Sequence, residues 1–264
     1  ISPEETIIKE FNYEKNEINT ERLLEAWMID FISKNGFEGE KYDYVTHQVI
    51  ASPFKPLAYI DKMDIFAYRY LENFPDTEKP IEKYMVIELK KGKATRDFPL
   101  QLMRYVDWIS REYAAGDYSL IKAVGIAKGY PKGMQKILDE QCKRSYLSDL
   151  HPNTTSQWND LSLYEYSMNQ TNQLQIKKSN IFDSILELKE RLSDIGIEYN
   201  TGKIRINGEV YAPKFKVQSK KWAFFDGLNE EERIVLNENK WKVIDIGGIK
   251  NKAEVDQLIL ELFK

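Results

Sequence analysis

The spacing of apolar residues divides residues 20–167 into helix, three strands, helix, strand, helix and strand. The first helix is expected over 20–34, where apolar side chains recur every three or four residues between a capping Thr20 and a terminating Asn35-Gly36. Strands are expected over 42–51, 57–70, 83–90, 120–127 and 161–166, and further helices over 95–113 and 132–144. The polar segments 1–19 and 151–160 are expected to form a loose lead-in and a loop. This order predicts an α/β domain over residues 1–167.

Residues 168–180 are polar and rich in amide side chains, so they are expected to form a linker. A smaller α+β domain is expected over 181–264, with a role in recognition or dimerisation. Its predicted helices cover 181–195, 229–237 and 252–263, and its predicted strands cover 203–206, 209–211, 214–217, 222–225 and 241–246.

Charged residues stand at the end of the otherwise apolar strand over 83–90. Because successive strand side chains point to opposite faces, Glu88 and Lys90 share one face with Val86, while Ile87 and Leu89 share the other. Burying a charge is costly unless it is paired or binds an ion. The alternative is that these residues form no site: the strand end is exposed, and Glu88 is a surface partner of neighbouring lysines.

Other polar residues also occur in apolar surroundings. Asp64 lies within an apolar strand, which is unusual for a carboxylate. Gln101 and Tyr105 share one face of a helix, where they either serve a site or make ordinary helix and core contacts. Glu21 lies at the edge of the apolar face of the first helix, with Glu25 further out. Glu21 either reaches into a cleft or is a first-turn acid favoured by the helix dipole.

Composition excludes several classes of protein. The chain of 264 residues is 42% apolar and 30% charged, which is typical of a globular protein. One cysteine, Cys142, excludes an internal disulfide, and two histidines, His47 and His151, leave little for a histidine-based site. No apolar run is long enough to span a membrane, and residues 1–5 do not resemble a signal peptide. The expected location is therefore the cytoplasm, without membrane association. The net charge of −4 argues weakly against nucleic-acid binding.

The polar residues nevertheless resemble the pattern of the PD-(D/E)xK nuclease superfamily, and most closely its NucS-type and RecB-type members. Asp64 within Lys-Met-Asp-Ile-Phe-Ala matches the first acid, with Met63 in place of the usual proline. Glu88-Leu-Lys90 matches the Glu-x-Lys motif, and Gln101-Leu-Met-Arg-Tyr105 matches the Gln-x-x-x-Tyr motif. Glu21 is a looser match to the helix acid. The resemblance covers about residues 18–167 and implies a restriction-endonuclease-like mixed sheet flanked by helices.

The resemblance implies a hydrolase that cleaves DNA with Mg²⁺, for which Mn²⁺ can substitute. Asp64, Glu88 and the Leu89 carbonyl are the expected ligands, because hard oxygen donors suit these ions. Glu21 would hold an outer-shell water or a second ion. Lys90 would position the attacking water or stabilise the pentavalent phosphorus. Gln101 and Tyr105 would orient the site or the DNA backbone.

Basic residues elsewhere are further candidates for DNA contact. Besides Lys93, they are Lys214, Lys216, Lys220 and Lys221, which interleave with aromatic residues. This pattern either grips a nucleic-acid backbone and stacks bases or forms a solvated strand face over an aromatic core. We therefore expect a metal-dependent DNA endonuclease of restriction, defence or repair type, acting as a homodimer or with partner subunits. The alternatives are a non-catalytic DNA-binding or assembly module on the nuclease fold, and a nuclease subunit of a larger defence or transposition complex.

Overall fold

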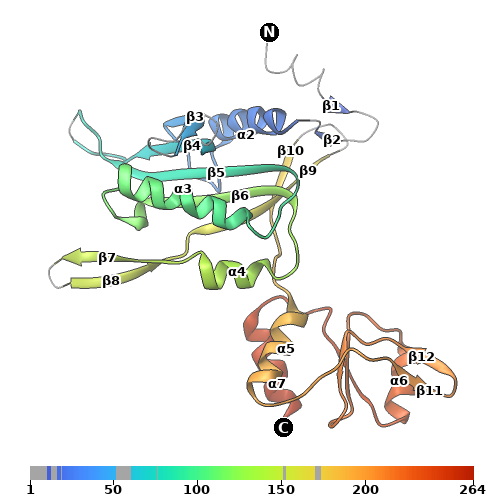
Figure 1. The fold of residues 1–264 in the computed structure, drawn as a ribbon. Coiled ribbons are helices and arrows are strands. Elements are labelled where there is room, and N and C mark those ends of the chain that lie inside the picture. The colour runs from blue at the N-terminus through green and yellow to red at the C-terminus, as the bar shows by residue number, and fades with distance from the viewer. Residues whose placement is uncertain are drawn as a thin grey trace. The chain divides into compact units, whose positions relative to one another are not determined.

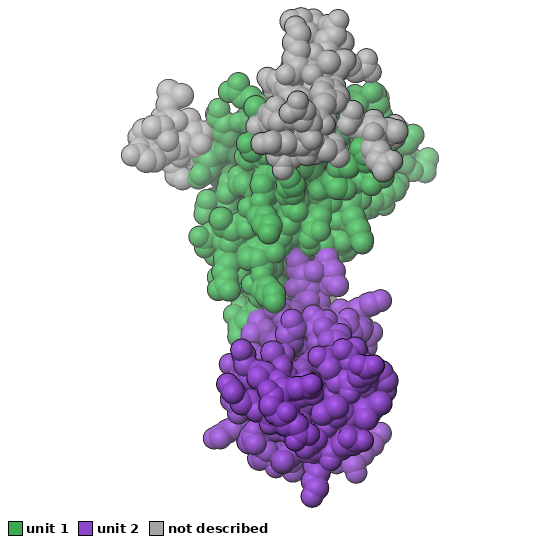
Figure 2. Space-filling view, turned by 90° about the vertical axis from the view of Figure 1, so that its right-hand side faces the viewer, with its two compact units in different colours: residues 1–179 green, residues 180–264 purple. Residues whose placement is uncertain are grey.

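The structure is a computed structural model that describes residues 11–12, 17–18, 20–51, 61–75, 77–150, 153–169 and 174–264. It divides into two compact units, residues 1–179 and 180–264 (Figure 2). Most of the lead-in expected over 1–19, and residues 57–60 of the second expected strand, lie outside the described residues.

The first unit is a mixed α/β fold in which helices flank a central sheet (Figure 1). Its helices are α2 (Glu21–Asn35), α3 (Phe98–Glu112), the short 3₁₀ helix η2 (Tyr118–Leu120) and α4 (Met134–Gln141). Its strands are β1 (Phe11–Asn12), β2 (Glu17–Ile18), β3 (Tyr44–Ile50), β4 (Lys62–Tyr70), β5 (Ile81–Lys93), β6 (Ile121–Gly129), β7 (Arg144–Leu150), β8 (Asn153–Trp158), β9 (Leu161–Met168) and β10 (Leu174–Lys178).

The central sheet has six strands in the order β10-β9-β6-β5-β4-β3. Strands β3, β4 and β5 form an antiparallel meander. Strand β6 is parallel to both β5 and β9, and β10 is antiparallel to β9. The predicted mixed sheet is therefore confirmed, and the parallel ends of β5 and β6 lie side by side.

Two helices cover opposite faces of this sheet. Helix α2 buries Leu24 and Met28 in one apolar cluster with Ile87 and Leu89 of β5. Its start is fixed by the Thr20 side chain, which accepts a hydrogen bond from the Leu23 N–H at 3.2 Å. Helix α3 covers the other face, and its first residue contacts the sheet at Gly125. A methyl group at Gly125 would lie only 2.6 Å from the Phe98 ring. Glycine thus allows α3 to approach the face that carries Glu88.

The predictions of a loop over 151–160 and a linker over 168–180 are wrong, because each segment contains a strand rich in polar residues. The expected loop over 151–160 contains β8, which pairs with β7 in an antiparallel hairpin. The expected linker over 168–180 contains the end of β9 and all of β10, which pair with each other. Leu174 and Ile176 of β10 pack against the same cluster as α2. The boundary between the two units accordingly falls at residues 179–180.

The second unit has a small sheet with an apolar cluster on each face. Its helices are α5 (Ser184–Asp194), α6 (Glu230–Glu238) and α7 (Lys252–Leu262), and its strands are β11 (Ile204–Ile206), β12 (Glu209–Tyr211), β13 (Phe215–Val217), β14 (Trp222–Phe225) and β15 (Lys242–Asp245). Strands β13, β14 and β15 form the sheet in that order. Phe215 and Phe224 belong to one cluster, and Phe225 and Trp241 belong to the other. Among the described residues, no helix is long and apolar enough to cross a membrane.

Candidate active site

The polar site begins where the hydrogen-bonded pairing of β4 with β5 ends. The last pair on this side is Ile65 with Ile87, so Asp64 and Glu88 would be the next pair. Instead, the Asp64 Oδ2 atom accepts a hydrogen bond from the Leu89 N–H at 2.8 Å. Because the N–H and C=O of one strand residue project to the same side, the Leu89 carbonyl also points toward this opening. The separation of two strands therefore brings side-chain and backbone oxygens together.

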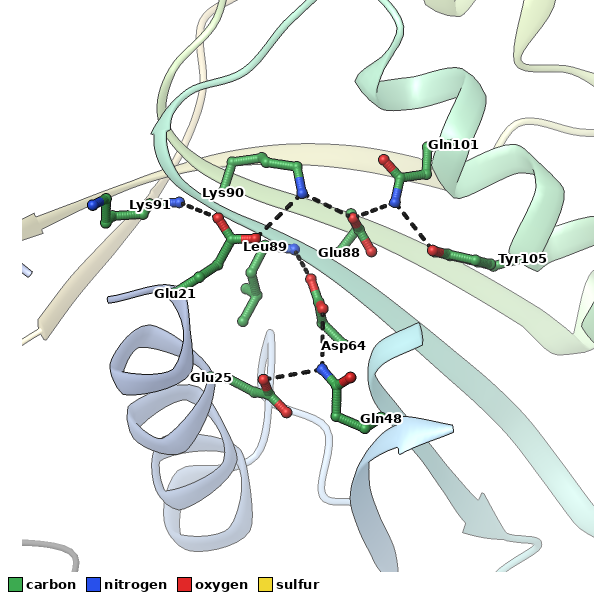
Figure 3. A network of polar contacts seen from close by, with 10 residues as sticks. All are labelled: Glu21, Glu25, Gln48, Asp64, Glu88, Leu89, Lys90, Lys91, Gln101 and Tyr105. Carbon is green, nitrogen blue, oxygen red and sulfur yellow. Dashed lines mark hydrogen bonds and ion pairs between the residues drawn. The ribbon is translucent and has the colours of Figure 1, made fainter. Parts of the chain in front are cut away.

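Glu88 is the most buried charged group of the site, with 2% of its surface exposed. Its Oε1 atom accepts hydrogen bonds from the Gln101 Nε2 at 2.6 Å and from the Lys90 Nζ at 3.2 Å. Gln101 also donates to the Tyr105 hydroxyl at 3.1 Å (Figure 3). The Oε2 atom of Glu88 is buried and has no hydrogen-bond partner within the described part of the chain. A buried carboxylate oxygen without a donor is a natural position for a ligand.

The two neighbouring carboxylates resist being ionised together. Burial, followed by the charge of Asp64, raises the pKa of Glu88 to about 8, although Lys90 acts in the opposite direction. Burial also raises the pKa of Asp64, and the Leu89 N–H partly offsets this effect. A proton on Glu88 is therefore favoured near neutral pH until a cation replaces it.

Lys90 lies between Glu88 and Glu21. Its Nζ atom is 3.2 Å from the Glu88 Oε1 and 3.3 Å from the Glu21 Oε1. Burial lowers the pKa of Lys90, but the charges of Glu88 and Glu21 outweigh burial, and the net pKa is raised. The second oxygen of Glu21 accepts the Lys91 N–H at 3.2 Å. Lys90 is thus held in place as a cation across neutral pH.

Glu25 and Gln48 belong to the same network, although neither is part of the sequence motifs described above. Glu25, which was expected to lie further out than Glu21, is 7% exposed and accepts from the Gln48 Nε2 at 3.2 Å. The same nitrogen lies 3.4 Å from the Asp64 Oδ1, so it bridges two carboxylates (Figure 3). The His47 Nδ1 lies 2.8 Å from the other oxygen of Glu25. The spacing of Glu21 and Glu25, four residues apart on one helix, was the available signal.

Gln48 has an unusual backbone for a strand residue. Its φ is +54°, although residues with a side chain rarely adopt this left-handed region. The neighbours His47 and Val49 pair normally with β4, so the distortion is confined to Gln48. Strained backbone of this kind costs on the order of 1–3 kcal/mol and often marks a functional site. Here it accompanies the bridge to Asp64.

Replacing Gln48 by glycine is expected to weaken binding of a divalent cation while leaving the fold intact. Glycine relieves the left-handed backbone but removes the amide that orients Asp64, and loss of such a supporting group typically costs about 10- to 100-fold in metal affinity. Calorimetric titration with Mn²⁺ measures the effect. Ala115→Gly is the matched control, because Ala115 has a φ of +49° in the turn after α3. Equal affinities for the two variants would show that the bridge does not orient Asp64.

The donor atoms of the site fit Mg²⁺ or Mn²⁺. Among the described residues there is no group of three or more His, Cys, Asp or Glu side chains arranged to hold a metal. Mg²⁺, however, usually takes one or two carboxylates and keeps several waters. The carboxylates of Asp64 and Glu88 and the Leu89 carbonyl match that requirement, and the Glu88 Oε2 has no hydrogen-bond partner among the described residues.

The structure thus brings together Glu21, Asp64, Glu88, Leu89, Lys90, Gln101 and Tyr105. Burial and the charge of Glu88 raise the pKa of Tyr105, so its hydroxyl stays protonated.

Lys93 lies at the exposed end of β5, opposite Gly129 of β6. The other predicted DNA contacts lie in the second unit, at Lys214, Lys216, Lys220 and Lys221.

Comparison with known proteins identifies similar solved structures but no family. No protein-family model matches the chain, and no curated protein matches it. A crystal structure of a repair endonuclease from Pyrococcus abyssi is 23% identical, with a TM-score of 0.31, over 45% of this chain and 43% of that one. The structure of an EndoMS–dsDNA2 complex is 20% identical, with a TM-score of 0.28, over 44% of this chain and 40% of that one. The match therefore spans less than half of each solved chain.

Proposed function

We propose that this protein is a metal-dependent endonuclease that hydrolyses phosphodiester bonds in DNA, in restriction, defence or repair. One observation carries the proposal: the buried Glu88 has an oxygen without a hydrogen-bond partner among the described residues, and it is paired with a cationic Lys90 next to Asp64. The chain order of Asp64, Glu88-x-Lys90 and Gln101-x-x-x-Tyr105 supports the same reading through its resemblance to the PD-(D/E)xK pattern. The central mixed sheet is compatible with that resemblance.

In this proposal Asp64, Glu88 and the Leu89 carbonyl hold Mg²⁺ or Mn²⁺. The bound ion would neutralise charge on the phosphoryl oxygens and lower the pKa of a coordinated water. Gln101 keeps Glu88 in position by its 2.6 Å hydrogen bond, and Gln48 orients Asp64. These contacts hold the ligands in one geometry before substrate arrives.

Lys90 has the role of a cationic stabiliser. Because its pKa is raised, its ammonium group does not accept a proton near neutral pH and is a poor general base. A fixed positive charge instead stabilises the negative charge that builds on the phosphoryl group. Glu21 restrains the ammonium from the opposite side. Glu21 is therefore proposed as a positioning residue for Lys90.

Basic residues around the ends of β5 and β6 are proposed to contact the DNA backbone. Lys93 and Arg96 follow Lys90 along the chain and are exposed, and Lys128 and Lys132 are exposed near the end of β6. The two segments are joined by a hydrogen bond from the Ala94 N–H to the Gly129 carbonyl at 2.9 Å. Cationic side chains beside a phosphate-cleaving site fix the register of the backbone.

Incubating the purified protein with supercoiled plasmid tests this function. Nicked or linear product is expected with Mg²⁺ or Mn²⁺ and not with EDTA, and Asp64→Asn is expected to be inactive with either ion. Cleavage that persists in EDTA would exclude the metal from the mechanism. Binding of DNA without cleavage in any metal would instead favour a non-catalytic DNA-binding module.

A further inference from the structure

The turn between β13 and β14 meets the start of β15 at one end of the small sheet in the second unit. The Lys242 N–H donates to the Lys221 carbonyl at 2.8 Å, which joins the two segments. Trp241 precedes β15 and packs in the cluster that contains Phe225 and Leu236, with 7% of its surface exposed. Residues from two separate parts of the sequence thus form one local surface around Trp241.

Two lysines are held against the Trp241 ring. The Nζ atoms of Lys216 and Lys221 lie 5.7 and 5.6 Å from the ring centroid, within the range of cation–π attraction. The Lys216 ammonium also donates to the Lys203 carbonyl at 2.9 Å. These contacts hold two long side chains at defined positions. Two ammonium groups near one ring also repel each other, so an anion that contacts both is favoured.

Three further exposed lysines belong to the same segments and complete what we call the Trp241 surface. The Lys203 carbonyl accepts from Lys216, Lys220 precedes Lys221, and Lys240 precedes Trp241. The surface consists of Trp241 with Lys203, Lys216, Lys220, Lys221 and Lys240, whereas Lys242 pairs with Trp222, which packs on the other face of the sheet. None of these lysines forms an ion pair with an acid in the described part of the chain, although Glu198 and Glu238 are close in sequence. Lys214 differs, because its Nζ is 3.9 Å from Asp226. Compared with the four lysines expected from the sequence, the surface therefore lacks Lys214 and adds Lys203 and Lys240.

We infer that the Trp241 surface binds the phosphate backbone of duplex DNA. Lys216 and Lys221 are held at defined positions, and the other lysines of the surface have no paired acid among the described residues. Such cations bind phosphates, and release of counterions strengthens the binding. The aromatic residues of this region are buried, with Trp222 at 6% and Phe225 at 4%, so they are not available to stack on bases. The surface thus contacts phosphates and does not read sequence. The inference shares with the proposed function the assumption that DNA is the ligand, but it requires neither metal nor cleavage.

Fluorescence anisotropy of labelled duplex DNA with the full chain, in EDTA and over a range of NaCl concentrations, tests the inference. The first variant combines Lys203→Gln, Lys220→Gln and Lys240→Gln, all at exposed positions. We expect the slope of log affinity against log salt to become shallower by about one for each lysine that contacts a phosphate. A second variant, Lys216→Gln with Lys221→Gln, removes the pair on Trp241 and is expected to weaken binding in the same direction.

The control combines Lys250→Gln, Lys252→Gln and Lys264→Gln, which removes the same charge elsewhere in the second unit. Thermal unfolding verifies that all variants are folded. A control slope that falls as far as that of the first variant, or slopes that do not change in either surface variant, would overturn the inference. Plasmid cleavage is measured in a separate assay. Loss of the Trp241 surface changes the salt dependence of DNA binding in EDTA. Failure of the proposed cleavage chemistry leaves that salt dependence unchanged.

Discussion

The Lys90→Ala variant is expected to cleave DNA about 100- to 1,000-fold more slowly than the unchanged protein, equivalent to about 2.7–4 kcal/mol of transition-state stabilisation. The physical reason is loss of a fixed ammonium group beside the phosphoryl oxygens. Binding of DNA should persist, because Lys90 is one cation among several near the ends of β5 and β6. Single-turnover rates at saturating metal measure the chemical step separately from binding.

The metal affinity of Lys90→Ala should depend on pH in a diagnostic way. Lys90 lowers the pKa of Glu88, so its removal raises that pKa further and strengthens competition by the proton near neutral pH. Above the pKa of Glu88, loss of a neighbouring positive charge should instead tighten metal binding. A series of Mn²⁺ titrations from pH 7 upward separates the two effects, because tighter binding is expected only above the raised pKa of Glu88. Lys83→Ala is the control, since Lys83 lies at the other end of β5 and contacts Ser119 and Asp160. Full activity of Lys90→Ala would refute the proposed role of Lys90.

The Glu88→Gln variant is expected to lose cleavage and yet to have a higher Tm than the unchanged protein when both are measured in EDTA above pH 8. The folded-state pKa of Glu88, about 8, lies above its ordinary value of 4.5. The folded state therefore holds this proton more tightly than the unfolded chain does. The favourable contribution is fully present below about pH 4.5 and is lost as the pH rises through about 8. Glutamine has no proton to lose and keeps the shape of the side chain.

Thermal unfolding from pH 5 to pH 9 measures the difference in Tm between the two proteins. The corresponding difference in the free energy of unfolding should grow with pH to the order of a few kcal/mol. Adding Mg²⁺ should raise the Tm of the unchanged protein and not that of Glu88→Gln, because a ligand that binds only the folded state stabilises it. Glu112→Gln, at an exposed position near the end of α3, is the matched control. A Tm difference that is independent of pH would contradict the buried, proton-binding role of Glu88.

Local signals in the sequence were sufficient for much of the site. The alternation along β5 correctly places Ile87 and Leu89 on one face and Glu88 on the other, and the structure shows that α2 covers the first of these faces. The four-residue spacing of Gln101 and Tyr105 correctly predicts their contact, which is 3.1 Å long. These features depend only on the period of one strand or one helix, which neighbouring elements do not alter.

Features that depend on pairing between elements were not predictable in this way. A helical wheel orients Glu25 but does not show that His47 and Gln48 of an edge strand lie against it. The alignment of Gln48 with Asp64 depends on the register of β3 with β4, and its left-handed backbone has no local sequence signal. Strands β8 and β10 are rich in polar residues and are defined by their pairing with neighbouring strands, so in the sequence they resemble loops.

The contacts beside the end of the β4–β5 pairing differ in the entropy that the unfolded chain loses when they form. The contact of Asp64 with Leu89 closes a loop of 25 residues, and that of Gln101 with Glu88 closes one of 13. The contact of Lys90 with Glu21 spans 69 residues. Since the entropy lost on closure grows only with the logarithm of loop length, going from 25 to 69 residues adds about 1 kcal/mol. Asp64, Glu88 and Gln101 thus belong to one segment of the chain, residues 64–101. The contact of Glu21 with Lys90 is the one that joins this segment to a distant part of the sequence.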